Sequence, residues 1–347
     1  MAKEALLEIK DLRVNFYTYR GIVKALNGVN LKIYEGEFFG LVGETGCGKS
    51  VTASAVLNLV QNPGKIEEGE ILFKQKNLLK MSEKEIREKI RGKEITMIMQ
   101  YPIAALNPVI NNGDQIAEAL IANKNMNESE ARKRTIELLR EVNIPEPEEI
   151  ARQFPHQLSG GMAQRVMIAM MISTEPSLLI ADEPTTALDV SIQSQVLNLL
   201  KDLISKHRTT VLLITHDLSV VAETCDRVGV MYAGDMVEAG TVDQIINNPY
   251  HPYTKGLIKA IPSDLSKELV EIRGSVPDLV NPPSGCRFHP RCDYAKPICK
   301  REKPQVLQVE KDHVTACFLY EENHNKKSKE EYAGEYKGGA NGRTDSA

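Results

Sequence analysis

The sequence predicts an α/β fold in which a mostly parallel sheet is covered by helices on both faces. Apolar runs at 178–181, 211–214 and 228–231 alternate with helical segments, which is typical of strands buried on both sides. Residues 6–42 alternate instead in the manner of antiparallel strands, and residues 101–165 have a mostly helical pattern. We therefore expect a mixed sheet with an antiparallel β subdomain and an inserted helical subdomain.

Local signals predict the shorter elements between these regions. Ser82 and Glu85 have the spacing of a capping box, and Ile86 and Ile90 follow it four residues apart, which indicates a short helix. The remaining elements are, in chain order, a strand at 38–42, a helix from 50 to 60, a strand pair around 70–73 and a strand at 95–99.

The composition divides the chain into three parts. Residues 1–240 carry the strands and helices, with the helical subdomain at about 101–165. Residues 241–325 are rich in proline, contain four cysteines and have weak apolar periodicity, so we expect a small cysteine-rich C-terminal domain. The charged and polar residues 326–347 are expected to form a disordered tail.

Charge and hydropathy argue against nucleic-acid binding and against a membrane-spanning segment. The formal net charge is −4 over 347 residues, without the basic stripe that nucleic-acid binding requires. The start of the chain lacks a signal-peptide pattern, and no apolar run approaches the ~20 residues needed to cross a bilayer. We expect a cytoplasmic protein, soluble or peripheral to a membrane, that binds no nucleic acid.

A complete phosphate-binding loop lies between a predicted strand and a predicted helix. Its G-x-x-x-x-G-K-S spacing lets the backbone approach phosphates, with a lysine to neutralise charge and a serine hydroxyl to bind Mg²⁺. A nucleotide such as ATP is expected to contact the loop and the residue after it: Gly43, Glu44, Thr45, Gly46, Cys47, Gly48, Lys49, Ser50 and Val51.

Polar residues follow three of the predicted strands. Asp182 and Glu183 end one apolar run, Gln100 ends a second and His216 ends a third. The carboxyl ends of parallel strands are where open α/β sheets bind ligands. We expect Ser50 to bind Mg²⁺, Gln100 to bind Mg²⁺ or the attacking water, and Asp182 to contact the ion through water. Glu183 would take a proton from the attacking water and His216 would bond the γ-phosphate.

A second anion cradle occurs at residues 158–165, where Ser159, Gly160 and Gly161 open a predicted helix. Backbone N–H groups at a helix N-terminus attract anions. Since the chain already has one phosphate loop, the simplest interpretation is that this cradle serves a nucleotide bound by another subunit.

These motifs, in this order, resemble those of ABC transporter ATPases, which belong to the P-loop NTPases. The resemblance covers residues 6–240 and includes Ala187-Leu188-Asp189. It implies two subunits facing head to tail with two ATP molecules between them, and Asp189 helping to couple the two sites. It also implies an aromatic side chain stacked on adenine, for which Phe16 is the first candidate and Tyr17 and Tyr19 are the alternatives.

A narrower resemblance points to the ATPases of dipeptide and oligopeptide importers. It is carried by residues 97–109, 158–162, 182–195 and 248–254, with Tyr101 and Ala163 as departures from the usual pattern. It implies a second ATPase subunit, transmembrane permease subunits and, indirectly, a substrate-binding protein. The second ATPase would be a sister protein, giving a heterodimer at the cytoplasmic face of the membrane. Dipeptides, longer peptides and nickel remain possible cargoes.

Four cysteines in the C-terminal part suggest a metal site. Four grouped thiolates can hold a [4Fe–4S] cluster or zinc, and disulfides or free thiols are the alternatives. The resemblance to peptide importers implies the iron–sulfur cluster, with these residues as ligands: Cys286, Cys292, Cys299 and Cys317.

Two other functions are alternatives to peptide import. A non-transport ABC ATPase would require a long coiled-coil insertion, two fused cassettes or a basic face, and the sequence has none of these. A redox or metal sensor in the C-terminal part stays open as a secondary role.

Overall fold

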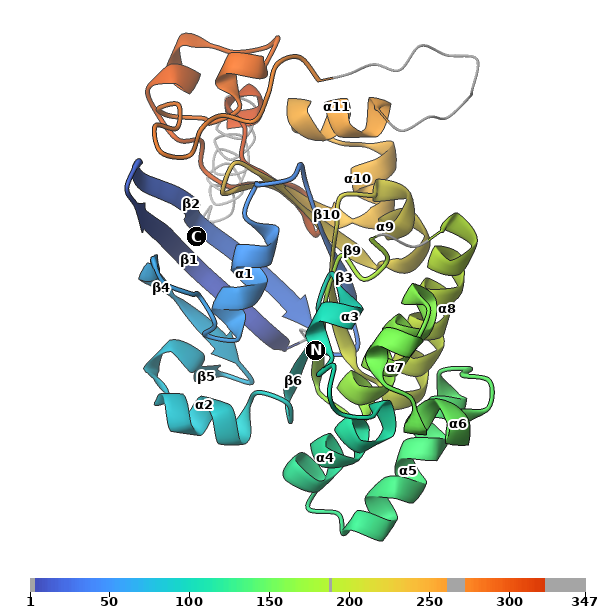
Figure 1. Ribbon diagram of the computed structural model, residues 1–347. Helices are drawn as coiled ribbons and strands as arrows, with labels where there is room; N and C mark the ends of the chain where they lie inside the picture. Colours follow the sequence, from blue (N-terminus) through green and yellow to red (C-terminus); the bar gives the residue numbers. More distant parts are fainter. Residues whose placement is uncertain (1–3, 187–188, 261–271, 322–347) are drawn as a thin grey trace, which may run out of the picture.

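The computed structural model describes residues 4–186, 189–260 and 272–321. These residues form two sheets with helices around and between them (Figure 1). Ala187 and Leu188 and the predicted tail at 326–347 lie outside the described residues.

The main sheet has eight strands in the order β11-β12-β10-β9-β3-β8-β7-β6. Strands β9, β3, β8, β7 and β6 run parallel, which confirms the prediction of a parallel sheet, and β10, β12 and β11 continue it antiparallel. The bounds are β3 (Phe38–Val42), β6 (Ile95–Ile98), β7 (Leu178–Asp182), β8 (Thr210–Thr215), β9 (Arg227–Tyr232), β10 (Asp235–Thr241), β11 (Leu307–Glu310) and β12 (His313–Thr315).

The second sheet is antiparallel and has the order β2-β1-β4-β5. It consists of β1 (Ala5–Thr18), β2 (Gly21–Tyr34), β4 (Gly64–Phe73) and β5 (Lys76–Asn77). The predicted antiparallel subdomain is therefore present, although the last strand of that region, β3, belongs to the main sheet.

Helices cover the main sheet on both faces and form the inserted helical block. The capping box at Ser82 and Glu85 is formed, as predicted. None of the helices in the described part of the chain is long and apolar enough to cross a membrane. Their bounds are α1 (Lys49–Val56), α2 (Glu83–Lys89), α3 (Pro102–Ala105), α4 (Asn112–Lys124), α5 (Glu128–Glu141), α6 (Pro147–Arg152), α7 (Gly160–Ile172), α8 (Val190–His207), α9 (Leu218–Thr224), α10 (Val242–Asn247) and α11 (Pro252–Lys259).

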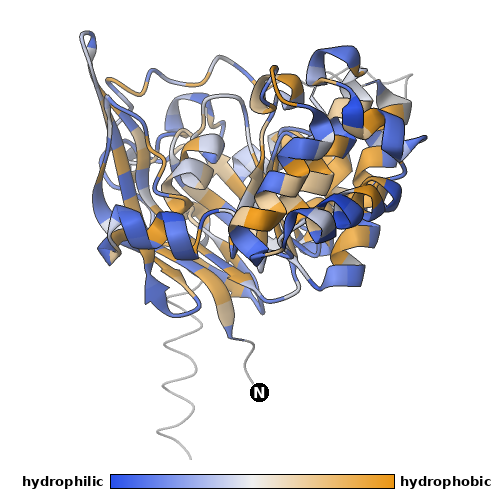
Figure 2. Ribbon diagram, turned by 60° about the horizontal axis from the view of Figure 1, so that its bottom comes forward, coloured by the Kyte–Doolittle hydropathy of each residue, from blue (hydrophilic) through white to orange (hydrophobic). Residues whose placement is uncertain are grey.

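The parallel strands separate two hydrophobic cores. In β7, Leu178 and Ile180 face the core that contains α1 and the antiparallel sheet, whereas Leu179 and Ala181 face the core built with α7, α8 and the helical block. Successive side chains of a strand point to opposite faces, so a strand buried on both faces must be apolar throughout. Figure 2 shows this arrangement, with hydrophobic strands inside and hydrophilic residues on the outer surface.

The residues after Gly240 extend the main sheet rather than form a separate cysteine-rich domain. Strand β12 pairs with β10, and β11 pairs with β12. Phe288 packs against Tyr232 of β9 and Tyr253 of α11, with ring centroids 5.0 and 5.4 Å apart. The fold prediction thus holds for the two sheets and the helical block, while a separate small domain finds no support, because these residues share a core with the parallel strands.

Candidate functional site

The loop that follows β3 has the backbone shape of a phosphate cradle. Gly43 has φ +152°, and a Cβ placed there would lie 2.1 Å from the carbonyl oxygen of Met231, so only glycine fits. Lys49 Nζ donates to the carbonyl oxygens of Gly43 (2.7 Å) and Glu44 (3.2 Å). The lysine is therefore held against the loop that it is predicted to serve.

Ser50, at the start of α1, meets the end of β7. Its hydroxyl Oγ lies 3.1 Å from Asp182 Oδ1. Burial raises the pKa of Asp182, and the nearby charge of Glu183 adds to this, while the bond from Ser50 opposes it. A hydroxyl and a carboxylate are oxygen ligands of the kind that Mg²⁺ prefers, so these residues fit the ion expected with ATP.

Glu183 is the centre of a polar cluster at the carboxyl ends of the strands. Gln100 Nε2 donates to its Oε2 (2.9 Å), Thr186 Oγ1 donates to the same oxygen (2.8 Å), and His216 Nδ1 lies 3.3 Å from its Oε1. Burial acts to raise the pKa of Glu183, but the bonds from Thr186 and His216 outweigh it and leave the pKa below its usual value. The carboxylate is therefore charged at neutral pH and able to accept a proton.

The structure brings together three of the residues placed at strand ends by the sequence, namely Gln100, Glu183 and His216. Thr186 was missed, because a threonine three residues after a strand carries no distinctive signal. Glu183 itself has φ +46°, an uncommon backbone conformation for a residue with a side chain.

Ser159 caps α7, with its Oγ accepting from the backbone N–H of Met162 at 3.4 Å. Ser159 and Gly160 are exposed. Figure 1 shows α7 and α1 on opposite faces of the main sheet, and their side chains belong to different cores. Among the described residues, no hydrogen bond joins residues 158–162 to the phosphate loop.

The three aromatic candidates for the adenine contact differ in exposure. Phe16 is half-buried and packs against the core between the two sheets, and Tyr17 is bonded through its hydroxyl to Glu67 (2.7 Å). Tyr19 is 91% exposed at the end of the β1–β2 hairpin. Their roles stay predictions, as does that of Asp189, which precedes α8 without a side-chain cap bond.

The sequence analysis also missed two residues that contact the phosphate loop from the C-terminal part. The hydroxyl of Tyr253 accepts from the backbone N–H of Glu44 at 2.9 Å, and Arg291 forms two hydrogen bonds with the Glu44 carboxylate. Their partner lies more than 200 positions earlier in the chain, and no local pattern can reveal such a pair.

The predicted iron–sulfur cluster is wrong, and so are its proposed ligands Cys286, Cys292, Cys299 and Cys317. Within residues 4–186, 189–260 and 272–321, no group of three or more histidine, cysteine or acidic side chains is arranged to hold a metal ion. All six cysteines are free thiols. The zinc alternative fails as well, because zinc needs such an arrangement of ligands too.

Comparison with known proteins agrees with the geometry of the nucleotide loop. Residues 26–186 match the family described as ABC transporter, and residues 237–299 match the family described as oligopeptide/dipeptide transporter, C-terminal region. The dipeptide transport ATP-binding protein DppD of Bacillus subtilis is 48% identical over 92% of this chain and 96% of its own length. The oligopeptide transport ATP-binding protein OppD of Escherichia coli is 44% identical over 91% and 93%.

Solved structures give the same result for the core. The ATP-binding cassette MJ0796, as a dimer in a post-hydrolysis state bound to ADP and Pi, is 30% identical with a TM-score of 0.62, over 68% of this chain and 98% of that one. CbiO1 of Clostridium perfringens, part of the ABC transporter complex CbiONQ, is 29% identical with a TM-score of 0.60, over 71% and 92%. With a phosphate loop, an acidic strand end and a capped glycine helix on this fold, the chain belongs to the family of ABC transporter ATP-binding proteins that includes the dipeptide and oligopeptide transport subunits.

Proposed function

We propose that this subunit hydrolyses ATP in a nucleotide-sandwich dimer and thereby drives uptake of dipeptides or oligopeptides through membrane permease subunits. One observation carries the proposal. The chain has two anion cradles that reach the surface, the phosphate loop at Thr45, Gly46 and Ser50 and the turn before α7 at Ser159 and Gly160. The helices that follow them lie on opposite faces of the main sheet. Each cradle is therefore available to a second subunit, and one copy alone leaves its own phosphate loop open.

The residues of the nucleotide edge divide the work of hydrolysis. Lys49 and the loop backbone hold the phosphates. Ser50 and Gln100 would hold Mg²⁺, with Asp182 contacting it through water, and the ion would supply positive charge to the phosphate oxygens. Glu183 accepts a proton from the attacking water. At the same time the water oxygen forms a bond to the γ-phosphorus, and the bond between the γ-phosphorus and the β-phosphate oxygen breaks. His216 bonds the γ-phosphate.

The proposed role in peptide import also implies partner proteins. The peptide importers named among the relatives suggest a sister ATPase subunit, permeases and a substrate-binding protein, with this subunit at the cytoplasmic face of the membrane. The exposed side chains Tyr101, Ile103 and Val109 around α3 follow Gln100 directly and supply an apolar surface for the permease. Phe16 or Tyr19 would contact adenine, and Ser159, Gly160 and Gly161 would contact the γ-phosphate of the nucleotide on the partner.

Light scattering on the Glu183→Gln protein tests the sandwich. We expect ATP to double the mass of the chain, alone or mixed with the ATPase that co-purifies with it from membranes, because bound nucleotide that is not hydrolysed keeps the dimer closed. Adding Gly160→Asp should abolish this dimer while leaving ATP binding to the chain's own loop intact. A monomer that hydrolyses ATP at full speed, independent of protein concentration and of Gly160, would contradict the proposal.

A further inference from the structure

The C-terminal residues reach back to the phosphate loop through one arginine. Arg291 Nη1 donates to Glu44 Oε2 (2.7 Å), and Nη2 donates to Glu44 Oε1 (3.1 Å). The Arg291 side chain is 6% exposed and that of Glu44 is 29% exposed. Glu44 is the second residue of the loop, so this two-pronged ion pair connects the C-terminal part directly to the nucleotide site.

Arg291 is itself fixed by neighbours outside the loop. Its Nε donates to the carbonyl oxygen of Arg273 (2.7 Å), and its Nη2 lies 3.3 Å from the carbonyl oxygens of Ile272 and Gly274. Its guanidinium also lies over the ring of Tyr232, 5.7 Å from the centroid. A guanidinium held at so many points is a rigid support for the carboxylate that it binds.

The backbone of Glu44 is held as well. Its N–H donates to the hydroxyl of Tyr253 at 2.9 Å. Tyr253 is fully buried, and its ring packs against Tyr232 with centroids 4.7 Å apart. Both the backbone and the side chain of Glu44 are therefore attached to residues beyond the ATPase core motifs.

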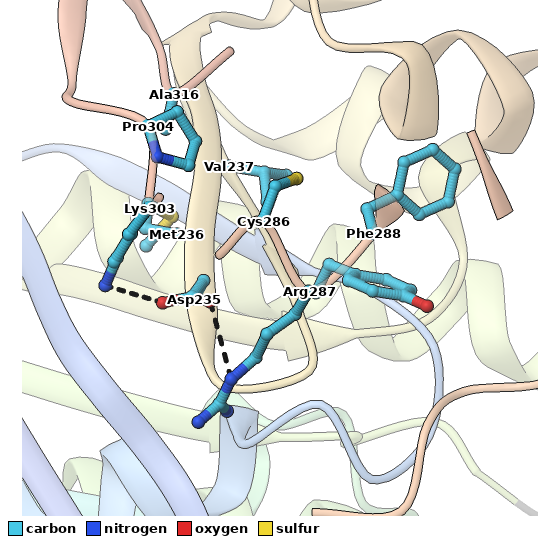
Figure 3. Close-up of a pocket in the computed structure, with 10 residues that line it drawn as sticks. Asp235, Met236, Val237, Cys286, Arg287, Phe288, Lys303, Pro304 and Ala316 are labelled. Atoms are coloured by element: carbon cyan, nitrogen blue, oxygen red, sulfur yellow. Dashed lines mark ion pairs between the residues drawn. The ribbon is translucent and has the colours of Figure 1, made fainter. Parts of the chain in front are cut away.

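A second connection reaches the loop through the turn between β9 and β10. The N–H of Gly234 in this turn donates to the carbonyl oxygen of Cys47 at 2.8 Å. Figure 3 shows Arg287 and Lys303, both from the C-terminal part, converging on Asp235, the first residue of β10, with ion-pair distances of 3.7 and 2.7 Å. Arg287 also donates to the carbonyl oxygen of Ala233. The C-terminal part thus supports the loop at its second and its fifth residue.

We propose that Arg291 is a positioning residue for ATP binding, which acts by holding Glu44 so that the phosphate loop keeps its binding shape. The proposal rests on ATP occupying this loop. A loop with three glycines has many backbone conformations available, and fixing one of them in advance lowers the cost of binding. The ion pair also neutralises a carboxylate that would otherwise repel the triphosphate.

The first test compares ATP affinity of full-length variants, measured with a fluorescent ATP analogue. Arg291→Met keeps an apolar stem and removes the ion pair, and we expect its dissociation constant to rise about tenfold, as for the loss of a charged hydrogen bond. Arg291→Lys should recover part of this loss. Arg273→Met is the matched control, since that side chain is 86% exposed and pairs with Asp293 at the surface, and it should stay within about twofold.

The second test uses Glu44→Gln, which leaves the other contacts of Arg291 intact. Electrostatics alone predicts that removing this negative charge strengthens ATP binding, whereas a positioning role predicts that binding weakens, by about fivefold. In the Glu44→Gln background, Arg291→Met should add less than about twofold, because both changes remove the same interaction. In steady-state hydrolysis, KM for ATP should rise more than kcat falls.

Three results would overturn the proposal. They are tighter ATP binding by Glu44→Gln, an Arg291→Met effect of the same size in both backgrounds, and Arg291 variants that lose stability without losing ATP affinity. Lys49→Ala separates this proposal from the one on which it rests. If that variant keeps its ATP affinity, the nucleotide site itself is wrongly assigned, whereas if it loses affinity and Arg291→Met does not, only the positioning role fails.

Discussion

Two acid–histidine clusters lie on the main sheet in opposite surroundings. At the nucleotide edge, Glu183 and His216 are 3.3 Å apart, and the His216 side chain is 61% exposed. At the other end of the sheet, Glu238 of β10 and His313 of β12 are 2.8 Å apart, and neither side chain is exposed at all. The same residue types thus lie at an open edge in one place and in a closed core in the other, so access to ligand, rather than composition, separates the proposed catalytic pair from the buried one.

In the buried cluster, backbone N–H groups bind both carboxylate oxygens of Glu238. Glu238 accepts from the N–H of Tyr250 (2.6 Å) with one oxygen and from the N–H of His251 (2.9 Å) with the other. It therefore joins β10, β12 and the turn before α11.

The largest effect is expected from Glu183→Gln. The amide cannot accept a proton from water, so kcat for ATP hydrolysis should fall about 10³-fold, while ATP affinity and stability change little. Phosphate release under saturating ATP measures this loss. Glu175→Gln is a suitable control, because this surface acid lies before the opposite end of β7 and pairs with Lys124, and it should hydrolyse ATP at the normal rate. Normal turnover by Glu183→Gln would remove Glu183 from the role of base.

Glu238→Gln should have the reverse profile. The oxygen of the glutamine amide can accept from one of the two backbone N–H groups, but its NH₂ group would face the other N–H, which is also a donor. The free energy of unfolding should therefore fall by about 3 kcal/mol. The kcat of the folded protein should not change. Urea unfolding measures the loss, and Glu310→Gln, which removes a carboxylate at the rim of the same region, should cost less than about 1 kcal/mol. A loss below 1 kcal/mol for Glu238→Gln would show that the cluster is not a structural tie.

The smallest effect concerns pH. Burial lowers the pKa of His251 to about 4, and its Nδ1 accepts from the N–H of Tyr253 at 3.1 Å. The unfolded chain has an ordinary histidine pKa of about 6.5, so between these values the unfolded state binds a proton that the folded state does not. The stability from this group is full above pH 6.5 and is lost as the pH falls toward 4, by roughly 2 kcal/mol at pH 5. His251→Asn keeps the capping acceptor and should lose less stability than the parent between pH 7 and pH 5; equal losses would contradict the assignment.

Much of the nucleotide edge was predictable because its geometry is local. The loop spacing fixes where Lys49 and Ser50 lie relative to the strand before them. Parallel strands bring their carboxyl ends to one edge, so Gln100, Glu183 and His216 had to meet once the three strands were recognised. Alternation of apolar residues likewise predicted the antiparallel sheet and the buried parallel strands.

The C-terminal part was less predictable because its contacts are distant in sequence. The weak apolar periodicity suggested a separate unit, yet β12 pairs with β10, and Arg291 forms an ion pair with Glu44, 247 positions earlier in the chain. Cysteine spacing shows only that thiols share a segment, and it does not fix the distances and directions that a metal requires. That gap explains the mistaken cluster.

The pairing of Glu44 with Arg291 has a consequence for how the protein folds during its synthesis. A ribosome delivers residues in order, so the phosphate loop is made long before the arginine that supports it. Under the proposed role of Arg291, ATP binding at full affinity must therefore wait until residue 291 has been made and has folded against the loop.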